Sequence, residues 1–201
     1  MDKIIAYSAI TSNKDKLRED ILVFSEFSRF KSPVYNAKVY KLLPHKFLIC
    51  DISIWVDGNI FLLKEPQFYI DRWLRDADMA IFMHNHAFRI YKEEMYLESM
   101  FKNRTPWVKD EVRNQLKHYR KIGIPEDTKM YMGGFIIRRH NERTARFNEA
   151  WWAEICRWSQ RDQLSLPVIL MQFPDLKVNF IGGNIKKHKY LKYENHAHFD
   201  S

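Results

Sequence analysis

Residues 51–62, DISIWVDGNIFL, hold the pattern that decides the fold. Apolar residues alternate from Ile52 to Val56, which predicts a β-strand. The strand ends at Asp57, and a glycine and an asparagine follow before a second short apolar run. Asp-Gly between two short strands is typical of a turn, whereas an acid at the carboxyl end of a strand is typical of a ligand site. Taken alone, these residues leave both interpretations of Asp57 open.

Strand patterns alternate with helix patterns along the rest of the chain. The other predicted strands are residues 3–10, 78–85, 129–140 and 176–182. The predicted helices are residues 36–43, 65–77, 87–101, 106–123, 141–159 and 161–173, with a further helix start at 12–20. Pro44 ends the first of these helices, and Pro167 bends or interrupts the last. This alternation predicts an α/β fold: a single domain with a central mixed, mostly parallel β-sheet flanked by helices.

Composition narrows the classes of function. The net charge is +8, which suits an anionic partner. The basic residues are spread along the chain and so signal nucleic acid only weakly, and a phosphorylated small molecule would satisfy the same charge. A solvated basic surface is the alternative. No apolar stretch approaches the ~20 residues of a membrane span. Cys50 and Cys156 each lie in an apolar stretch, which predicts two buried thiols in a reducing, cytoplasmic setting.

A second acidic motif, RDADMA, competes with Asp57. Asp76 and Asp78 have the D-x-D spacing that often holds a divalent metal, but they precede a predicted strand whereas Asp57 follows one. In a parallel sheet the two motifs therefore lie at opposite edges, and ligands collect at the carboxyl edge. The strand after RDA brings His84 and Arg89 to that edge. We therefore interpret Asp76 and Asp78 as turn residues and expect the site at Asp57.

Three further segments contain acidic residues or paired glycines that a ligand site could use. Glu93, a few residues after His84, either faces a cavity or lies on a solvated helix start. Asp162 begins a predicted helix, where an acid either caps backbone N–H groups or faces a ligand. Gly133 and Gly134 lie inside a predicted strand, where missing side chains permit the close approach of a ligand or another backbone. Each segment has a structural and a functional interpretation.

Five blocks of sequence, taken together and in order, resemble a known family. They are KVYKLLPHKFL, SIWVDGNI, MAIFMHNHAFRIYKEE, GGFIIRRHN and WWAEICRWSQRDQLSLP, and they cover about residues 35–170. The family is the glycosyltransferase-like domain of bacterial polysaccharide proteins, plant cell-wall proteins and chlorella-virus glycosyltransferases. The resemblance implies a GT-A-like fold and one nucleotide-sugar-binding glycosyltransferase domain over residues 1–201, which can be the N-terminal domain of a longer protein.

The resemblance also implies a reaction. It is the metal-dependent transfer of a hexose from a UDP-sugar, such as UDP-glucose, to a hydroxyl group of a glycan or glycoprotein acceptor. The implied cofactor is Mn²⁺ or Mg²⁺, and neither a nucleic-acid partner nor a membrane span is expected. The alternatives are a nucleotide-sugar-binding module without transfer activity and, further away, a basic nucleic-acid-binding domain.

The same resemblance assigns the site residues. The metal ligands would be Asp57, Asn59 and a C-terminal histidine, with His188, His196 and His198 as candidates. The donor-binding residues would be Tyr7, Ala9, Ile10 and Thr11 at the nucleoside, Lys38 near the phosphates, and Val56, Asp57, Gly58 and Asn59. The catalytic residues would be Asp162, Arg89, His84 and Glu93, with Asp162 facing the donor sugar or the acceptor hydroxyl.

Overall fold

A six-stranded sheet forms the centre of the structure, a computed structural model that describes residues 2–12, 18–84, 88–95 and 106–195. Its strands are β1 (Ile4–Ala9), β2 (Leu22–Phe24), β3 (Ile52–Val56), β5 (Met79–Met83), β6 (Tyr131–Arg139) and β7 (Val178–Ile181). Their order is β2-β1-β3-β6-β5-β7. Neighbouring strands are parallel except where β6 pairs with β3 and β5. The predicted mixed, mostly parallel sheet is confirmed.

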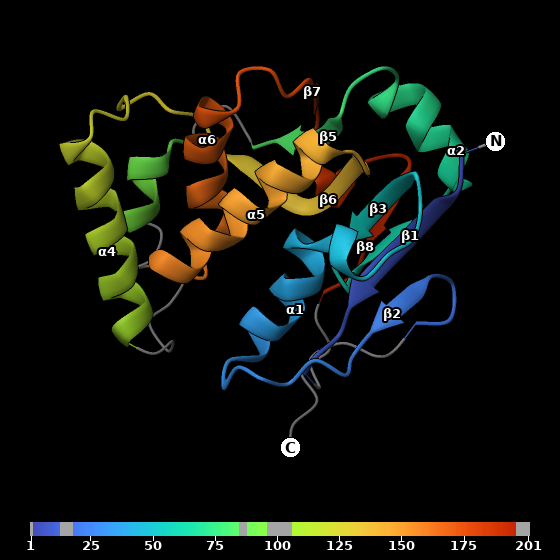
Figure 1. The fold of residues 1–201 in the computed structure, drawn as a ribbon, viewed down its shortest axis with the longest axis horizontal. Helices are drawn as coiled ribbons and strands as arrows, with labels where there is room; N and C mark the ends of the chain where they lie inside the picture. Colours follow the sequence, from blue (N-terminus) through green and yellow to red (C-terminus); the bar gives the residue numbers. More distant parts are fainter. Residues whose placement is uncertain (1, 13–17, 85–87, 96–105, 196–201) are drawn as a thin grey trace.

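Helices pack on both faces of this sheet. One face carries α1 (Pro33–Leu42), α5 (Glu142–Arg157) and α6 (Asp162–Gln172). Helix α4 (Pro106–Lys121) stands beyond them and packs against α6, as Figure 1 shows. The other face carries α2 (Pro66–Tyr69), its π-helical continuation η2 (Ile70–Leu74), and a small sheet of β4 (Ile60–Leu62) and β8 (Leu191–Tyr193). Short 3₁₀ turns are η1 (Pro44–Lys46), η3 (Ile90–Lys92) and η4 (Ile185–Lys187).

The alternation of residues in β3 serves both halves of the core. Ile52, Ile54 and Val56 pack on the α2 side of the sheet, while Trp55 packs on the α1 side beside Tyr7 of β1. All five side chains of β3 are buried. Burying a side chain of this size contributes about 1.5–3 kcal/mol relative to leaving it exposed. The strand is therefore held from both faces, and the position of Asp57 at its end is well defined.

The pairing of β5 with β6 is irregular close to this end of the sheet. Ile81 pairs with Ile136, but the next residue, Phe82, pairs with Met132. The stretch from Gly133 to Phe135 therefore has no partner in β5 and forms a bulge. Because β6 runs antiparallel to its neighbours, this bulge lies at the carboxyl ends of β3 and β5.

Some elements depart from the predictions. Strand β8 follows β7 and pairs with β4, and its three residues are too few to give a periodic signal. Helix α6 continues through Pro167, although proline removes one backbone hydrogen bond there. Residues 13–17 of the predicted helix start at 12–20, and residues 87 and 96–101 of the predicted helix at 87–101, lie outside the described residues. The described part of the second helix contains the 3₁₀ turn η3.

The cysteines are both free thiols, but they are less buried than predicted. Cys50 is half-buried and Cys156 is exposed. Cys156 follows Ile155, which lies on the buried face of α5 with Trp151, and one residue further along a helix turns the side chain away from that face. No helix in the described part of the chain is long and apolar enough to cross a membrane.

Candidate functional site

Asp57 lies at the carboxyl edge of the sheet, in the turn that joins β3 to β4. Its backbone N–H donates to the Gly134 carbonyl (2.8 Å), and its carbonyl accepts from the Ile60 N–H (2.9 Å), so the turn interpretation is confirmed as geometry. Its Oδ1 accepts a hydrogen bond from Trp55 Nε1 (2.9 Å) and lies 3.6 Å from Lys41 Nζ. The Asp57 side chain remains 42% exposed. A ligand can therefore reach this carboxylate.

A buried ion-pair cluster lies next to Asp57. Lys38 and Lys41 of α1 both contact the Asp162 carboxylate, at Nζ to oxygen distances of 2.8 and 2.6 Å. The side chains of all three residues are at most 11% exposed. Lys41 joins this cluster to Asp57. Four charged groups from α1, β3 and α6 thus meet at the ligand edge of the sheet.

Burial and neighbouring charges set the protonation of this cluster. Burial acts to raise the pKa of Asp162, but Lys38 and Lys41 outweigh it and hold that pKa well below its usual range. Burial acts to lower the pKa of Lys41, and Asp162 and Asp57 outweigh it and raise that pKa. For Lys38, burial prevails over the attraction of Asp162, and with the charge of Lys41 it lowers the pKa to about 8. Lys38 is therefore the lysine that loses its proton first as the pH rises.

Asp162 begins α6, but its carboxylate does not serve as the cap of that helix. The N-cap position is Arg161, and its side chain makes no capping hydrogen bond. The Ser159 hydroxyl, ahead of the helix, donates to Gln115 Oε1 (2.5 Å) and accepts from the Arg161 N–H (3.4 Å). The Asp162 carboxylate pairs with the lysines instead, and its place in the first turn adds a favourable interaction with the helix dipole.

A second charged pair includes Arg161, the residue before Asp162. Arg161 donates to the Glu93 carboxylate, and the Glu93 side chain is only 4% exposed, so its interpretation as a solvated helix start is wrong. Burial lowers the pKa of His84, with Glu93 opposing and Arg161 adding to the effect. His84 therefore lies within electrostatic range of Glu93 and Arg161. Arg89 lies on the same segment as Glu93, and its guanidinium donates to the carbonyl of the preceding residue (3.5 Å).

The two glycines of the β6 bulge leave room for these charges. A Cβ atom on Gly133 would lie 2.9 Å from Lys41 Nζ and 3.0 Å from Asp162 Oδ2. A Cβ atom on Gly134 would lie 3.1 Å from Asp57 Oδ2. These distances are shorter than ordinary van der Waals contacts, so a larger residue at either position would displace a charged group of the site.

The structure narrows the predicted donor-binding residues at the ends of β1 and β3. Four of them are buried, namely Tyr7, Ala9, Ile10 and Val56. Alternate side chains of a strand point to opposite faces of the sheet, so a residue near the strand end can point into the core rather than across the edge. The Tyr7 hydroxyl accordingly donates to the Tyr40 carbonyl (3.3 Å) inside the core. Thr11 and Gly58 are the predicted donor contacts that, like Asp57, are partly exposed.

The Asp57 carboxylate has the chemistry that a divalent cation prefers. Hard cations take oxygen ligands, often one or two carboxylates completed by phosphate oxygens and water. Trp55 and Lys41 both contact Oδ1 of Asp57, and its Oδ2 faces Gly134. No group of three His, Cys, Asp or Glu side chains within the described ranges is arranged to hold a metal. Among the described residues, the protein would therefore supply one carboxylate ligand, that of Asp57, to such a cation.

The other predicted metal ligands have different surroundings. Asn59 is buried, its Nδ2 donates to the Glu194 carbonyl (3.0 Å), and its carbonyl accepts from the Glu194 N–H (2.9 Å). His188 Nδ1 accepts from the Tyr190 N–H (3.3 Å), so a neutral ring carries its proton on Nε2 and offers no lone pair there. His196 and His198 lie outside the described residues.

Asp76 and Asp78 lie at the opposite edge of the sheet, as predicted. Asp78 precedes β5, and its carboxylate accepts hydrogen bonds from Asn141 Nδ2 (2.9 Å), Arg143 Nη1 (2.8 Å) and the Lys177 N–H (3.0 Å). Asp76 lies in the turn after η2. The interpretation of this D-x-D motif as a structural turn is confirmed.

Three residues of the site were missed by the sequence analysis: Trp55, Lys41 and Arg161. A signal existed for Lys41, because it follows Lys38 by three positions and residues at that spacing share one face of a helix. Arg161 and Trp55 gave no signal of their own. Arg161 is recognisable only once Glu93 is seen to be buried, and Trp55 only through its hydrogen bond to Asp57.

Comparisons with known proteins identify the family of this chain. The model of a family described as "TOD1/MUCI70, glycosyltransferase-like domain" matches residues 3–194. The probable hexosyltransferase MUCI70 of Arabidopsis thaliana is 28% identical over an alignment of 141 residues that covers 67% of this chain and 24% of that protein. The alkaline ceramidase TOD1 of the same plant is 26% identical over an alignment of 180 residues that covers 82% of this chain and 37% of that protein. The chain thus spans well under half of either relative.

A solved structure is similar over the whole chain. It is a glycosyltransferase involved in the glycosylation of the major capsid of PBCV-1, with a TM-score of 0.50 and 10% sequence identity. The match covers 99% of this chain and 94% of that one. At this identity the likeness concerns the fold alone, and it confirms the predicted glycosyltransferase-like α/β architecture.

Proposed function

Because the chain belongs to the TOD1/MUCI70 glycosyltransferase-like domain family, we propose that it moves a hexose from a UDP-sugar to a hydroxyl group of a glycan or glycoprotein acceptor. Membership of the family and the likeness to a probable hexosyltransferase support glycosyl transfer. The UDP donor, such as UDP-glucose, and the acceptor are the proposed parts. The proposal concerns the domain described above, because it matches only part of the plant relatives.

The observation that carries this proposal is the charged cluster at the carboxyl edge of the sheet. In sheets of this kind ligands bind at that edge. Lys38 and Lys41 are held by the buried Asp162 before any substrate arrives. Charges that are fixed in advance stabilise a developing negative charge without reorganising, and a departing diphosphate carries such a charge. We therefore assign the two lysines to the diphosphate.

A divalent cation, Mn²⁺ or Mg²⁺, is assigned to Asp57. When bound, it would supply positive charge to the diphosphate of the donor. Asp57 offers one exposed carboxylate beside Gly134, and the substrate's phosphates and water would complete the ligand set. The pairing of Glu194 with Asn59 keeps the start of the C-terminal tail beside this turn, which favours His196 or His198 over His188 as a further ligand.

The remaining residues are assigned to positioning and to the sugar. A carboxyl group whose pKa is held low is a poor proton acceptor, so Asp162 is assigned to anchoring the lysines. His84, Arg89 and Glu93 are assigned to the surroundings of the transferred sugar, as the resemblance implies. The two free thiols support the expectation of a reducing, cytoplasmic setting.

The Asp57→Asn variant tests the proposal, and Asp76→Asn is its matched control. Both substitutions remove one negative charge, but Asp76 lies in a turn at the opposite edge of the sheet. In a thermal-shift experiment, UDP with MnCl₂ should stabilise the wild type and the control, by about 2.7 kcal/mol at a ligand concentration of 100 Kd. The Asp57→Asn variant should show no Mn²⁺-dependent shift. Undiminished binding of UDP by that variant would overturn the assignment of the metal.

Transfer itself is measured as the release of UDP from a panel of UDP-hexoses with oligosaccharide acceptors. Binding of UDP without transfer to any acceptor would identify a nucleotide-sugar-binding module. Tight, salt-dependent binding of single-stranded RNA without binding of UDP would identify the nucleic-acid alternative.

The name of the second plant relative supplies a rival activity, the hydrolysis of ceramide. It is tested on the same preparation by measuring the release of fatty acid from ceramide in detergent micelles. Release of fatty acid without binding of UDP would replace the present proposal. We expect binding and turnover of the UDP-sugar and no release of fatty acid.

A further inference from the structure

A separate pocket of about 440 Å³ lies between η2 and the edge strand β7. Its walls include Arg72, Trp73, Arg75, His188, Lys189 and Tyr190. None of the described residues that line it is Asp or Glu. A concave surface lined by cations without carboxylates attracts an anion. The proposed transfer reaction does not use this pocket.

The positive charge of the pocket acts on its two titratable rings. Burial lowers the pKa of His188, and the charges of Arg72 and Lys189 lower it further. The pKa of Tyr190 is lowered by a hydrogen bond from Lys189 and by the neighbouring cations, since a positive surrounding favours the phenolate. The cations thus act on both rings, although burial is the larger cause for His188.

Tyr190 also brings two of the cations together. The Arg72 guanidinium lies 5.1 Å and the Lys189 ammonium 4.8 Å from the centre of the Tyr190 ring. An aromatic ring attracts cations through its electron-rich face. Among the described residues no carboxylate lies within ion-pair distance of Arg72, Arg75 or Lys189. The ring therefore holds cations at the pocket that no described acid neutralises.

Arg75 has a backbone conformation that favours glycine. Its φ is 52° and its ψ is −119°, and it is the non-glycine residue with positive φ within the described ranges. The conformation is held from both sides, because its N–H donates to the Ile70 carbonyl (2.8 Å) and its carbonyl accepts from Arg139 (2.5 Å). Strained residues that persist in a fold concentrate at functional sites. An arginine at this position points to a use for its side chain.

We propose that this pocket binds an oxyanion, either a carboxylate or a phosphate group, through Arg72, Arg75 and Lys189. Guanidinium groups suit both anions because their N–H donors match two oxygens at once. An acidic sugar of a glycan and a free phosphate are the two sources of such a group. The loop that carries His188 also carries Ile185, whose Cδ1 lies 3.5 Å from where a Cβ atom of Gly134 would be. An anion in the pocket thus contacts a loop that reaches the candidate site.

The test is a titration of the protein with inorganic phosphate, sodium glucuronate and glucose at constant ionic strength, followed by NMR. Phosphate or glucuronate, or both, should bind the wild type, and glucose should not. Arg72→Gln/Arg75→Gln/Lys189→Gln should weaken the binding at least tenfold. The preferred anion identifies the source, phosphate indicating a phosphoryl group and glucuronate an acidic sugar.

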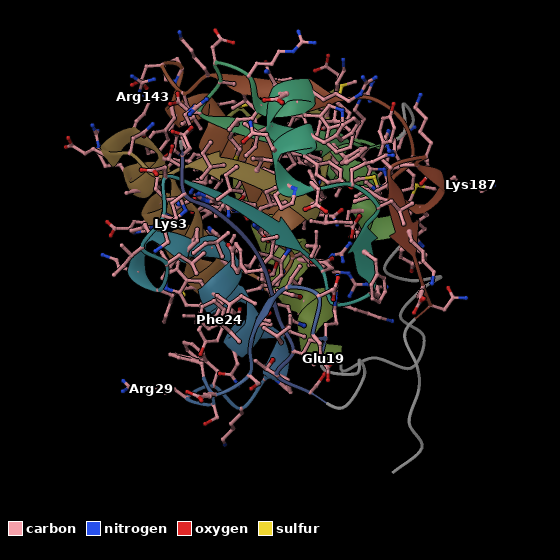
Figure 2. The ribbon with its side chains drawn as sticks, turned by 90° about the vertical axis from the view of Figure 1, so that its right-hand side faces the viewer. Lys3, Glu19, Phe24, Arg29, Arg143 and Lys187 are labelled. Carbon is pink, nitrogen blue, oxygen red and sulfur yellow. The ribbon has the colours of Figure 1, made fainter. Side chains whose placement is uncertain are left out.

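The matched control is Arg29→Gln/Lys31→Gln/Lys117→Gln, which removes three exposed charges elsewhere. Figure 2 shows Arg29 and Lys187, a residue of the loop that carries His188, on opposite sides of the molecule. The control should bind both anions as the wild type does. An equal loss in the two triple variants, or the failure of the wild type to bind either anion, would overturn the proposal.

A single substitution tests the pocket with a variant that is expected to be more stable than the wild type. Arg75→Gly relieves the backbone, so this variant should unfold at a higher urea concentration than the wild type. It should nevertheless bind the preferred anion at least threefold more weakly. A more stable variant with unchanged binding would show that Arg75 does not contact the anion and would contradict its assignment.

Discussion

Asp57 follows strand β3 and Asp78 precedes strand β5, and the two carboxylates have different surroundings. Asp78 accepts three hydrogen bonds from Asn141, Arg143 and the Lys177 backbone, and little of its side chain is exposed. Asp57 accepts one hydrogen bond, from Trp55, lies 3.6 Å from Lys41, and keeps 42% of its side chain exposed.

The difference shows how strand direction separates a structural acid from a binding acid. An acid before a parallel strand lies at the amino-terminal edge of the sheet, where neighbouring loops can enclose it. An acid after a strand lies at the edge where ligands bind, so part of its hydrogen-bonding capacity is left for a ligand. Asp162 extends the comparison, because it lies at the same edge as Asp57 and is as buried as Asp78.

The Asp162→Ala variant tests what determines how much an acid contributes to stability: its burial or the edge of the sheet at which it lies. Removing this carboxylate leaves Lys38 and Lys41 buried without their partner. We expect a loss of about 3–5 kcal/mol in the free energy of unfolding, because unpaired buried charges are strongly unfavourable. Urea denaturation at pH 7 measures it. A loss below about 1 kcal/mol would mean that the lysines find other partners.

Asp78→Ala and Asp57→Ala form a pair that tests the comparison directly. The first removes three hydrogen bonds to a buried carboxylate, and we expect it to lower the free energy of unfolding by about 2–3 kcal/mol. The second removes an exposed carboxylate, and we expect a change within about 1 kcal/mol. Both are measured by urea denaturation under one condition. Equal losses would erase the distinction between the two acids.

The pH dependence of UDP binding tests the charge state of Lys38. Its pKa is lowered to about 8, so the ammonium is protonated below that pH and loses its charge as the pH rises through it. We expect UDP to bind about tenfold more weakly at pH 9 than at pH 7, which corresponds to the loss of one charge-assisted hydrogen bond. Calorimetric titration measures it. Lys38→Arg keeps its charge and should lose this pH dependence, and the same dependence in that variant would exclude Lys38 as its source.

Gly133→Ala is expected to affect ligand binding more than stability. The added methyl group would meet Lys41 Nζ at 2.9 Å, so it should shift the charged cluster without opening the core. We expect a change in unfolding free energy within about 1 kcal/mol and a several-fold weaker binding of UDP. Gly182→Ala is the control, because a Cβ atom there would meet nothing within 4 Å. Unchanged binding in the Gly133 variant would separate Lys41 from the donor site.

Local sequence patterns predicted much of the fold, for identifiable reasons. The strand from Ile52 to Val56 and the helix ending before Pro44 depend on period and on proline, and both were found. The insertion of the antiparallel β6 between β3 and β5 depends on pairing between distant segments, which no local pattern records. Strand β8 was missed because three residues in a basic segment carry no periodicity.

The candidate site was predictable where it depended on strand direction. That rule separated Asp57 from Asp78, but it did not predict where side chains near a strand end point. The Tyr7 side chain, for example, points into the core and not across the edge of the sheet. Lys41 was missed because a lysine in a helix is ordinarily exposed, and its burial follows from the pairing with Asp162, which lies far away in the sequence.

The pairing of Asn59 with Glu194 joins residues 135 positions apart in the chain. Contacts of such long range form late in folding, because the entropy of closing a long loop must be overcome first. During synthesis, the turn that carries Asp57 is therefore made long before the segment that closes over it. The charged cluster requires only residues up to Asp162, so the part assigned to the diphosphate can assemble before the Asp57 turn receives its final support.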